Sequence, residues 1–273
     1  MQNKIAIQGI EGSNHYQVAQ HFIAEDNEFT CCDSFNQLVA AVANDEVDFG
    51  IMAIENSIAG SILPNYDLIS HHKLAITAEF YLDIKHNLVA LKGQELMDIK
   101  TVRSHQMALL QCRNFFEQQP QIKLVEDLDT ALPAWLIALQ GKKQVAALVP
   151  DGTAELFDLA IIKKHIQDHQ LNATRFVKVS KTSSMIREAD KASIRFELAH
   201  EPGSLNKVLA LLEKNDINMT KIQSVPVRQF KWQYAFFIDM LFKKDTDIIT
   251  IIDKLKEKCH HFQVLGIYKQ AAV

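Results

Sequence analysis

The segment from Ala192 to the C-terminus carries the pattern that most constrains the fold. Apolar residues there predict strands and helices in the order strand, helix, strand, strand, helix, strand. The predicted elements are, in chain order, Ala192–Ala199, Leu205–Lys214, Met219–Val225, Trp232–Leu241, Asp247–Cys259 and Phe262–Tyr268. This order is typical of a ferredoxin-like βαββαβ unit of about 80 residues, complete in itself. Since the segment contains no plausible pair of nucleophile and general base, we expect a regulatory or assembly role for it.

The region before this unit alternates short apolar strands with helices, which indicates an open α/β fold. The predicted elements are strands at Ile5–Ile7, Phe29–Cys32, Val47–Ile54, Leu74–Ile84, Asn87–Leu91, Ile99–Arg103, Val145–Val149 and Leu159–Ile162, and helices from Asn14 to about Ala24, at Phe35–Ala43, at Met107–Phe116 and from a Thr130 cap to Gln140. We expect the chain to cross into a second lobe near His86. Residues 181–191 have little apolar periodicity, so the expected division is a domain over 1–180, a linker over 181–191 and a domain over 192–273.

Composition excludes several classes of protein. The chain has 273 residues, of which 48% are hydrophobic and 23% charged, with a formal net charge of −4. A nucleic-acid surface would need clustered excess Lys and Arg, and the apolar runs are too short for a membrane span. The N-terminus passes from Lys4 directly into a strand, so we expect no signal peptide. Four cysteines without a CxxC pair indicate a reducing, cytoplasmic environment.

The histidines do not form a recognisable metal motif. His165 and His169 are four residues apart, but no Cys, Asp or Glu lies at a convincing companion spacing. We therefore expect no metal site.

Two polar motifs follow predicted strands in the first part of the chain. Gly9 and Gly12 precede Ser13 at a helix start, where backbone amides favour an anion. Glu55, Asn56 and Ser57 follow a buried strand, at the edge where open α/β sheets bind ligands. A helix cap by Asn56 or Ser57, with Glu55 near the helix dipole, explains the second motif equally well.

Two further stretches carry polar groups that suit a binding site. Ser104 and Gln111 are seven residues apart, so two helical turns would place them on one face; a serine cap and a surface glutamine are the alternative. Thr174, Arg175 and Phe176 place a hydroxyl, a guanidinium and an aromatic ring in succession. A neutral proton donor beside a cation suits a carboxylate substrate, although an ordinary strand start with a solvated arginine also fits.

Taken together, these motifs resemble the prephenate dehydratase family along the whole chain. The resemblance rests on four motifs and on a C-terminal segment that is similar to an ACT regulatory domain, the motifs being Gly9-x-x-Gly12, Ile54-Glu55-Asn56-Ser57-x-x-Gly60, Ser104-His105-x-x-Ala108-x-x-Gln111-Cys112 and Asn172-x-Thr174-Arg175-Phe176. It implies a two-lobed catalytic domain like the type II periplasmic binding proteins, with the site in the cleft between the lobes.

The resemblance also implies a reaction, from prephenate to phenylpyruvate, carbon dioxide and water, without a cofactor. The proton donor of the family maps onto Thr174, and Arg175 is the expected clamp for the carboxylate that stays. The other expected site residues are Asn56, Ser104 and Gln111 for orientation, Ser13 and Ser57 with Ser104 as helix starts that supply amides, Phe176 beside the substrate, and Glu55 in a role that the sequence leaves open.

The tail departs from the family's phenylalanine-binding motifs. Gln223-Ser224-Val225-Pro226 stands where the family usually has ESRP, and Gly203-Ser204-Leu205-Asn206 where it has GALV. Both an acid and a base are absent together, so no orphan charge results. The expected effector residues are Gly203, Ser204, Leu205, Asn218, Gln223 and Ser224. We expect phenylalanine as the effector and a homodimer or homotetramer built through the tail.

Three alternatives stay open at this point. An arogenate dehydratase performs the same chemistry on a substrate with an amino group instead of a keto group. A non-catalytic amino-acid sensor is disfavoured because it would not need Thr174. A bifunctional chain with a mutase step is disfavoured because no helical extension precedes Lys4.

Overall fold

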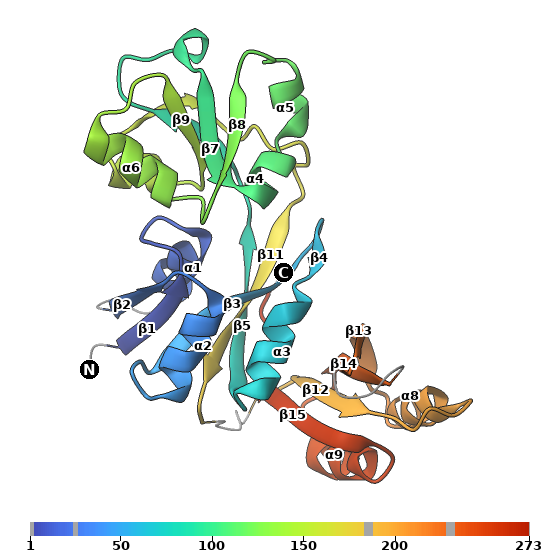
Figure 1. Cartoon of the computed structure of the whole chain (residues 1–273). Coiled ribbons are helices and arrows are strands. Elements are labelled where there is room, and N and C mark those ends of the chain that lie inside the picture. Colours follow the sequence, from blue (N-terminus) through green and yellow to red (C-terminus); the bar gives the residue numbers. More distant parts are fainter. Residues whose placement is uncertain (1–2, 24–26, 183–187, 228–232, 273) are drawn as a thin grey trace. The chain divides into compact units, whose positions relative to one another are not determined.

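The computed structural model describes residues 3–23, 27–182, 188–227 and 233–272. The chain forms two compact units, one of Met1–Ser61 and Phe80–Phe176 and the other of Ile62–Glu79 and Val177–Val273. The described residues form three sheets, two of them before residue 181 and one in the C-terminal region (Figure 1). Ala24, Trp232 and residues 183–187 of the expected linker lie outside the described residues. The expected boundaries at residues 180 and 192 stay a prediction.

The first sheet has the strand order β2-β1-β3-β11-β5, with β4 paired to β3. Its strands are β1 (Asn3–Gln8), β2 (Asn27–Cys32), β3 (Phe49–Asn56), β4 (Gly60–Ser61), β5 (Ala75–Asp83) and β11 (Ala173–Ser180). β1 pairs in parallel with β2 and with β3, which requires crossovers through α1 (Asn14–Phe22) and α2 (Phe35–Ala43). Ile5, Ile7 and Ile51 are fully buried, as expected for parallel strands that are covered on both faces.

The second sheet, with the order β10-β6-β9-β7-β8, forms the other lobe. Its strands are β6 (Asn87–Ala90), β7 (Thr101–His105), β8 (Lys123–Asp127), β9 (Val145–Val149) and β10 (Ala160–Lys163). The helices of this lobe are the 3-10 helix η1 (Leu96–Asp98), α4 (Gln106–Leu110), α5 (Arg113–Glu117), α6 (Leu132–Gln140) and α7 (Thr153–Leu156). Two apolar clusters pack on the sheet, one with Phe116 of α5 and the other with Ile137 of α6.

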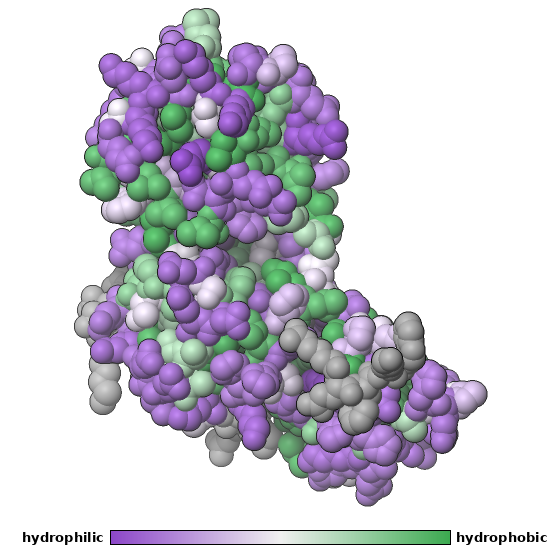
Figure 2. Space-filling model, in the orientation of Figure 1, coloured by the Kyte–Doolittle hydropathy of each residue, from purple (hydrophilic) through white to green (hydrophobic). Residues whose placement is uncertain are grey.

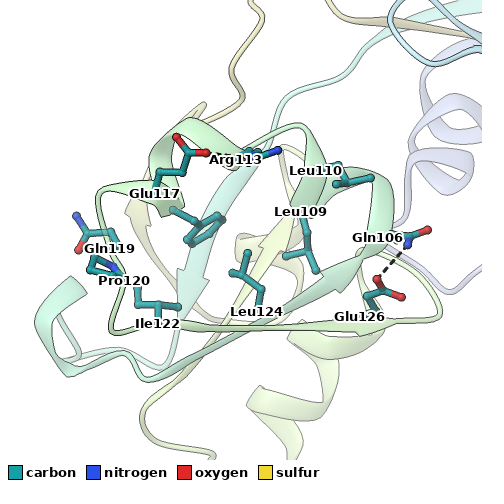
Figure 3. A pocket seen from close by; sticks show the side chains of 11 residues that line it. Gln106, Leu109, Leu110, Arg113, Glu117, Gln119, Pro120, Ile122, Leu124 and Glu126 are labelled. Carbon is teal, nitrogen blue, oxygen red and sulfur yellow. Dashed lines mark hydrogen bonds and ion pairs between the residues drawn. The ribbon is translucent and has the colours of Figure 1, made fainter.

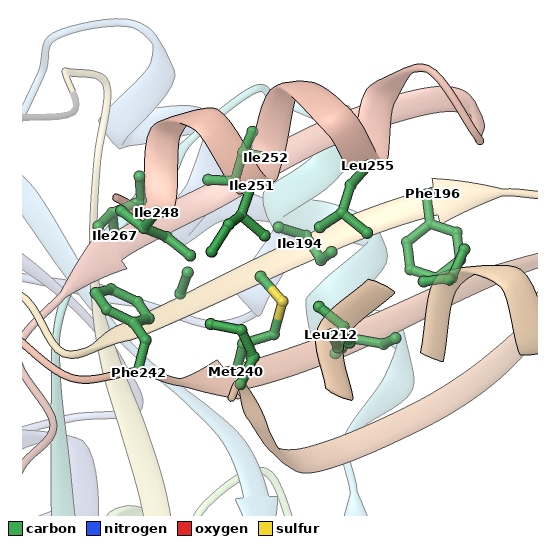
Figure 4. Close-up of a cluster of buried hydrophobic side chains, with 14 residues drawn as sticks. Ile194, Phe196, Leu212, Met240, Phe242, Ile248, Ile251, Ile252, Leu255 and Ile267 are labelled. Carbon is green, nitrogen blue, oxygen red and sulfur yellow. The ribbon is translucent and has the colours of Figure 1, made fainter. Parts of the chain in front are cut away.

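The third sheet has the order β13-β14-β12-β15, the strand order of a ferredoxin-like fold. It consists of β12 (Lys191–Glu197), β13 (Asn218–Pro226), β14 (Tyr234–Leu241) and β15 (His260–Tyr268), with α8 (Ser204–Lys214) and α9 (Ile248–Lys256). Its three strand pairs are antiparallel. Both helices contribute side chains to one apolar core, including Leu212 and Leu255 (Figure 4). The predicted βαββαβ unit, similar to an ACT domain, is confirmed.

The same compact unit contains α3 (Leu63–His71) and a buried ion pair. Lys191 Nζ, at the start of β12, lies 2.8 Å from Glu79 Oε2 on β5, and the two side chains are 3% and 0% exposed. The Ala271 N–H also donates to Glu79 Oε1. Buried charges persist when they are paired and hydrogen-bonded, so this contact fixes β12 against β5.

The bounds of the predicted elements were correct where they depend on residues close together in the sequence. The bounds of α2 and β9 agree with the prediction, and Ser34 accepts the Gln37 N–H at the start of α2. The single helix expected over Met107–Phe116 is wrong, because the chain forms α4 and α5 with Gln111 and Cys112 between them. Thr130 does not cap α6: the N-cap residue is Ala131, and the Asp129 carboxylate accepts the N–H groups of Ala131 and Leu132 at 2.6 Å each. The residue before α8 is Gly203, with φ 84°, and Ser204 is already the first residue of the helix.

Several large apolar side chains of the second lobe are exposed. They are Leu110, Leu124, Leu128, Trp135 and Leu139. Figure 2 shows hydrophobic residues in patches on this lobe, between hydrophilic ones. Among the described residues, no helix is both long enough and apolar enough to cross a membrane.

His15, on α1, is a buried titratable group in the core of the first lobe. Its side chain accepts the Ala53 N–H at Nε2 (3.3 Å), and its ring edge packs on Phe35 and Phe176. Burial, with a smaller contribution from the charge of His105, lowers the pKa of His15 to about 3. The folded protein therefore holds this imidazole in its neutral form.

Because His15 is buried in its neutral form, the free energy of unfolding should fall as the pH is lowered. The unfolded chain protonates His15 below pH ~6.5, whereas the folded chain resists protonation until about pH 3. Stability is therefore present above pH ~6.5 and is lost as the pH falls. Between pH 7 and 5 the wild type should lose up to about 2 kcal/mol more unfolding free energy than His15→Gln, measured by urea denaturation. Equal losses in the two proteins would contradict the assignment.

Candidate functional site

The loop from Gly9 to Gly12, between β1 and α1, packs against the second lobe. The Ile10 N–H donates to Asp129 Oδ2 (3.0 Å), and Thr153 Oγ1 donates to the Gly12 carbonyl (2.8 Å). Gly9 has φ 89°, and a Cβ there would lie 2.6 Å from Asp129 Oδ2. Glycine is required here because the loop approaches protein atoms closely. A ligand beside this loop stays a prediction.

Asp129 joins this loop to the start of α6. One carboxylate oxygen accepts the Ile10 N–H, and the other accepts the amides of Ala131 and Leu132. Burial raises the pKa of Asp129 above its ordinary value, although these three N–H groups oppose the rise. No sequence motif marks Asp129, since its importance lies in a contact with a loop 119 positions earlier.

The central group of the site is the Asn56 side chain, at the end of β3. Its carbonyl oxygen Oδ1 accepts the N–H groups of Ile58 (3.0 Å) and Ala59 (2.9 Å). Backbone amides only donate, so they fix which end of the Asn56 amide is the oxygen. The amide nitrogen Nδ2 therefore faces the start of β11, where it donates to Asn172 Oδ1 (2.8 Å) and Thr174 Oγ1 (2.9 Å).

The network continues from Asn172 into the second lobe. Asn172 Nδ2 donates to Gln111 Oε1 (2.9 Å), and His86 Nε2 lies 2.9 Å from the same oxygen. Asn56, Thr174 and Gln111, three residues proposed as catalytic from the sequence, thus belong to one hydrogen-bonded group. Asn172 and His86 complete it and were not among the expected site residues. Asn172 had a signal, its position in the Asn172–Phe176 motif, whereas His86 had none.

Thr174 and Arg175, adjacent on β11, contact different partners. Thr174 is 8% exposed, and among the described residues Asn56 is the hydrogen-bond partner of its hydroxyl. Arg175 is 5% exposed, and its Nη1 lies 3.5 Å from Glu55 Oε2. The neutral hydroxyl of Thr174 and the guanidinium of Arg175, whose charge is balanced by Glu55, therefore belong to adjacent residues. The solvated arginine of the alternative interpretation is wrong, because the guanidinium is buried.

The other expected site residues are engaged within the protein. Ser57 Oγ accepts the Ala173 N–H (3.0 Å) and so fixes the residue before Thr174. Ser13 Oγ accepts the Tyr16 N–H at the start of α1. Ser104 is fully buried and donates to the Leu148 carbonyl (2.8 Å).

Ser104 and Gln111 do not share a helix face, contrary to the prediction. Ser104 is part of β7, and Gln111 ends α4. The cap of α4 is His105, whose Nδ1 accepts the Met107 N–H. Phe176 is 1% exposed and packs on His15. The prediction that Ser57 and Ser104 are helix starts is wrong, because α3 begins at Leu63 and Ser104 lies within β7. Binding roles for Ser13, Ser57, Ser104 and Phe176 stay predictions.

The expected effector residues lie in the C-terminal unit. Gly203 precedes α8, Ser204 and Leu205 form its first turn, and Asn218 begins β13. Gln223 and Ser224 lie further along β13, which is an edge strand of its sheet.

An apolar hollow of about 430 Å³ lies on the second lobe (Figure 3). Leu109, Leu110 and Leu124 are among its lining residues, and Gln106 and Glu126 are linked by a hydrogen bond of 3.0 Å at its rim. Within the described part of the chain, no group of three or more His, Cys, Asp or Glu side chains is placed to hold a metal ion.

Comparisons with known proteins place this architecture in a family. Residues 5–184 match the family model of prephenate dehydratase. The chain is 31% identical to the bifunctional chorismate mutase/prephenate dehydratase of Aquifex aeolicus, covering 98% of this chain and 74% of that protein. It is 33% identical to arogenate dehydratase/prephenate dehydratase 2 of Arabidopsis thaliana, covering 97% and 72%. The crystal structure of prephenate dehydratase from Arthrobacter aurescens in complex with L-Phe has a TM-score of 0.88 at 27% identity, covering 99% of this chain and 92% of that one.

The match covers the two-lobed region, and the similarity to relatives continues through the ACT-like unit. The chain therefore belongs to the prephenate dehydratase family and is an enzyme of its class, the carbon–oxygen lyases.

Proposed function

We propose that this chain converts prephenate to phenylpyruvate, carbon dioxide and water, with Thr174 as the proton donor. The observation that carries the proposal is the hydrogen bond of 2.9 Å from Asn56 Nδ2 to Thr174 Oγ1. Asn56 supplies the hydrogen in this contact, so Thr174 Oγ1 accepts, and its own proton is directed to another acceptor. In the proposed reaction that acceptor is the ring hydroxyl of the substrate.

The reaction balances without a cofactor. The bond between the ring carbon and its hydroxyl breaks, and the hydroxyl leaves as water with the proton of Thr174. The bond between the ring and its carboxylate also breaks, carbon dioxide departs, and the bonding electrons complete the aromatic ring. Thr174 then regains a proton from solvent, so each turnover consumes one proton. Because threonine is a weak acid, catalysis depends on positioning and on stabilisation of developing charge.

Arg175, which is paired with Glu55 beside Thr174, is proposed to bind the substrate carboxylate that is not lost as carbon dioxide. Arg175 provides a fixed positive charge, and Glu55, 3.5 Å from its guanidinium, orients it. Glu55 is 34% exposed and Arg175 5%, so the pair is shielded from water mainly on the arginine side. Ser57 supports the site by fixing Ala173, and Gln111 supplies an amide to the substrate.

Arogenate is a second candidate substrate, since the relative from Arabidopsis thaliana carries both activities in its name. Arogenate differs from prephenate in bearing an amino group in place of the keto group. The network around Thr174 acts on the ring hydroxyl, which both substrates share.

Regulation by phenylalanine is proposed for the ACT-like unit. The structural relative from Arthrobacter aurescens is a complex with L-Phe. In this chain Gly203 has φ 84°, with open space where a Cβ would lie, so the backbone before α8 is accessible to an amino acid. Ser204, Leu205, Asn218, Gln223 and Ser224 are the proposed neighbours of that amino acid, and a homodimer or homotetramer through this unit is the proposed assembly.

The direct test incubates the purified chain with prephenate and, in parallel, with arogenate. We expect phenylpyruvate, detected by its absorbance in alkali, from prephenate, with a higher kcat/KM than for phenylalanine formation from arogenate. A higher kcat/KM with arogenate would make arogenate the preferred substrate in place of prephenate. If neither substrate gave a product, the proposed function would be wrong.

Substitution of Thr174 tests the proton donor. Thr174→Ala should lower kcat by about 10²–10⁴-fold, because general acid assistance of this size is lost. Thr174→Ser keeps the hydroxyl beside Asn56 and should retain appreciable activity. Steady-state kinetics with prephenate measure both, and an unchanged kcat in Thr174→Ala would exclude Thr174 from proton transfer.

Titration with phenylalanine, followed by activity and by sedimentation, tests the effector site. We expect the activity of the wild type to fall. Gly203→Ala should raise the half-inhibitory concentration by about tenfold, the effect of one lost favourable contact. Gly93→Ala is the matched control, because Gly93 has a similar φ of 83° and equally open surroundings. A flat response of the wild type in both measurements would count against an effector site.

A further inference from the structure

His86 is a buried histidine between β5 and β6 that the proposed reaction does not use. Its side chain is 2% exposed. Its backbone N–H donates to Gln167 Oε1 (3.0 Å), and its carbonyl accepts the Ile166 N–H (2.9 Å). The segment after β10 therefore holds the residue on both sides of its Cα, and the ring is directed to Gln111.

The hydrogen-bond directions in the network determine which ring nitrogen carries the proton. The amides of Ile58 and Ala59 fix Asn56 Oδ1, so Asn56 Nδ2 donates to Asn172 Oδ1. Asn172 must then present its nitrogen to Gln111, so the atom that it meets is the oxygen Oε1.

His86 Nε2 lies 2.9 Å from the same Gln111 oxygen. An oxygen in this position only accepts, so His86 Nε2 must donate and must carry the proton.

The other ring nitrogen explains why the ring stays neutral. His86 Nδ1 is buried and has no hydrogen-bond partner among the described residues. A second proton there would place a charged N–H in the interior without an acceptor. Burial accordingly lowers the pKa of His86, although the hydrogen bond to Gln111 opposes this effect. The neutral ring therefore donates one hydrogen bond, from Nε2, and its Nδ1 carries no proton.

We propose that His86 is a positioning residue, whose Nε2–H holds the Gln111 carbonyl oxygen so that the Gln111 NH2 group faces the substrate. Together with Asn172 Nδ2, it gives that oxygen two donors. A flipped amide would point its own NH2 group at both donors, so only one orientation is allowed. This inference rests on the proposed function, because it assigns the substrate an oxygen acceptor. Prephenate, with two carboxylates, supplies such acceptors.

The main test compares His86→Gln with His86→Asn. A glutamine places its amide nitrogen where Nε2 lies, whereas the shorter asparagine reaches only to the position of Nδ1. Both variants lose the ring, and asparagine leaves the larger cavity, so the packing cost of each variant is measured separately. We expect His86→Asn to lower kcat/KM by about 10–100-fold, the effect of a misplaced group in the site, and His86→Gln to retain at least about tenfold more activity than His86→Asn.

Thermal unfolding of both variants accompanies the kinetics. A purely structural role predicts that the loss of kcat/KM in each variant follows its loss of melting temperature, and that outcome would overturn the proposal. So would wild-type kcat/KM in His86→Asn. A companion variant, Gln111→Glu, replaces the outward NH2 by a carboxylate oxygen and should raise KM for prephenate, whereas an unchanged KM contradicts the assigned orientation.

The tautomer is measured without substrate. Long-range ¹H–¹⁵N spectra of the full chain, with His86→Gln used to assign the signal, should show Nε2 protonated and Nδ1 unprotonated at neutral pH. Protonation at Nδ1 would overturn the proposal, even in a wild-type chain that forms no phenylpyruvate. Failure of the proposed function and failure of this inference are therefore separate results.

Discussion

Two backbone amides, those of Ile58 and Ala59, determine the direction of the hydrogen bonds in the site. They fix the carbonyl oxygen of Asn56, and every hydrogen bond beyond it follows from that orientation. The Asn56 nitrogen then donates both to Thr174 and to Asn172. A single loop after β3 thus determines that the Thr174 hydroxyl acts as an acceptor toward Asn56. Side-chain networks of this kind stabilise one arrangement when every member is satisfied.

The sequence predicted those parts of the fold and of the site whose signals are local. Helix α2 has the predicted bounds, because its start depends on Ser34 and Gln37, which lie only three positions apart. The helix expected over Met107–Phe116 failed for a non-local reason. The Gln111 carbonyl accepts the Asp168 N–H at 2.7 Å, and its side chain binds Asn172, so tertiary contacts hold the chain out of a continuous helix.

The same distinction separates the site residues that were predicted from those that were missed. Thr174, Asn56 and Gln111 stand in recognisable motifs, and the structure brings them into one group. His86 lies in no motif, and its partner is 25 residues away in the sequence. Likewise, Asp129 and not Thr130 binds the amides of Ala131 and Leu132 at the start of α6, and its second oxygen accepts the Ile10 N–H of the first lobe. No local pattern encodes such a pairing.

Two charges and one neutral acid lie together on β3 and β11, and their arrangement explains how a weak acid serves the proposed reaction. A free carboxylate at Glu55 would repel a dianion, but Arg175 compensates its charge before any substrate arrives. The Thr174 hydroxyl does not ionise in water, so it releases its proton only as charge develops on the leaving oxygen. At that moment the Asn56 N–H already points at Oγ1, where negative charge would appear. A donor positioned in advance stabilises that charge without reorganisation, so the position of Asn56 contributes what the acidity of threonine does not supply.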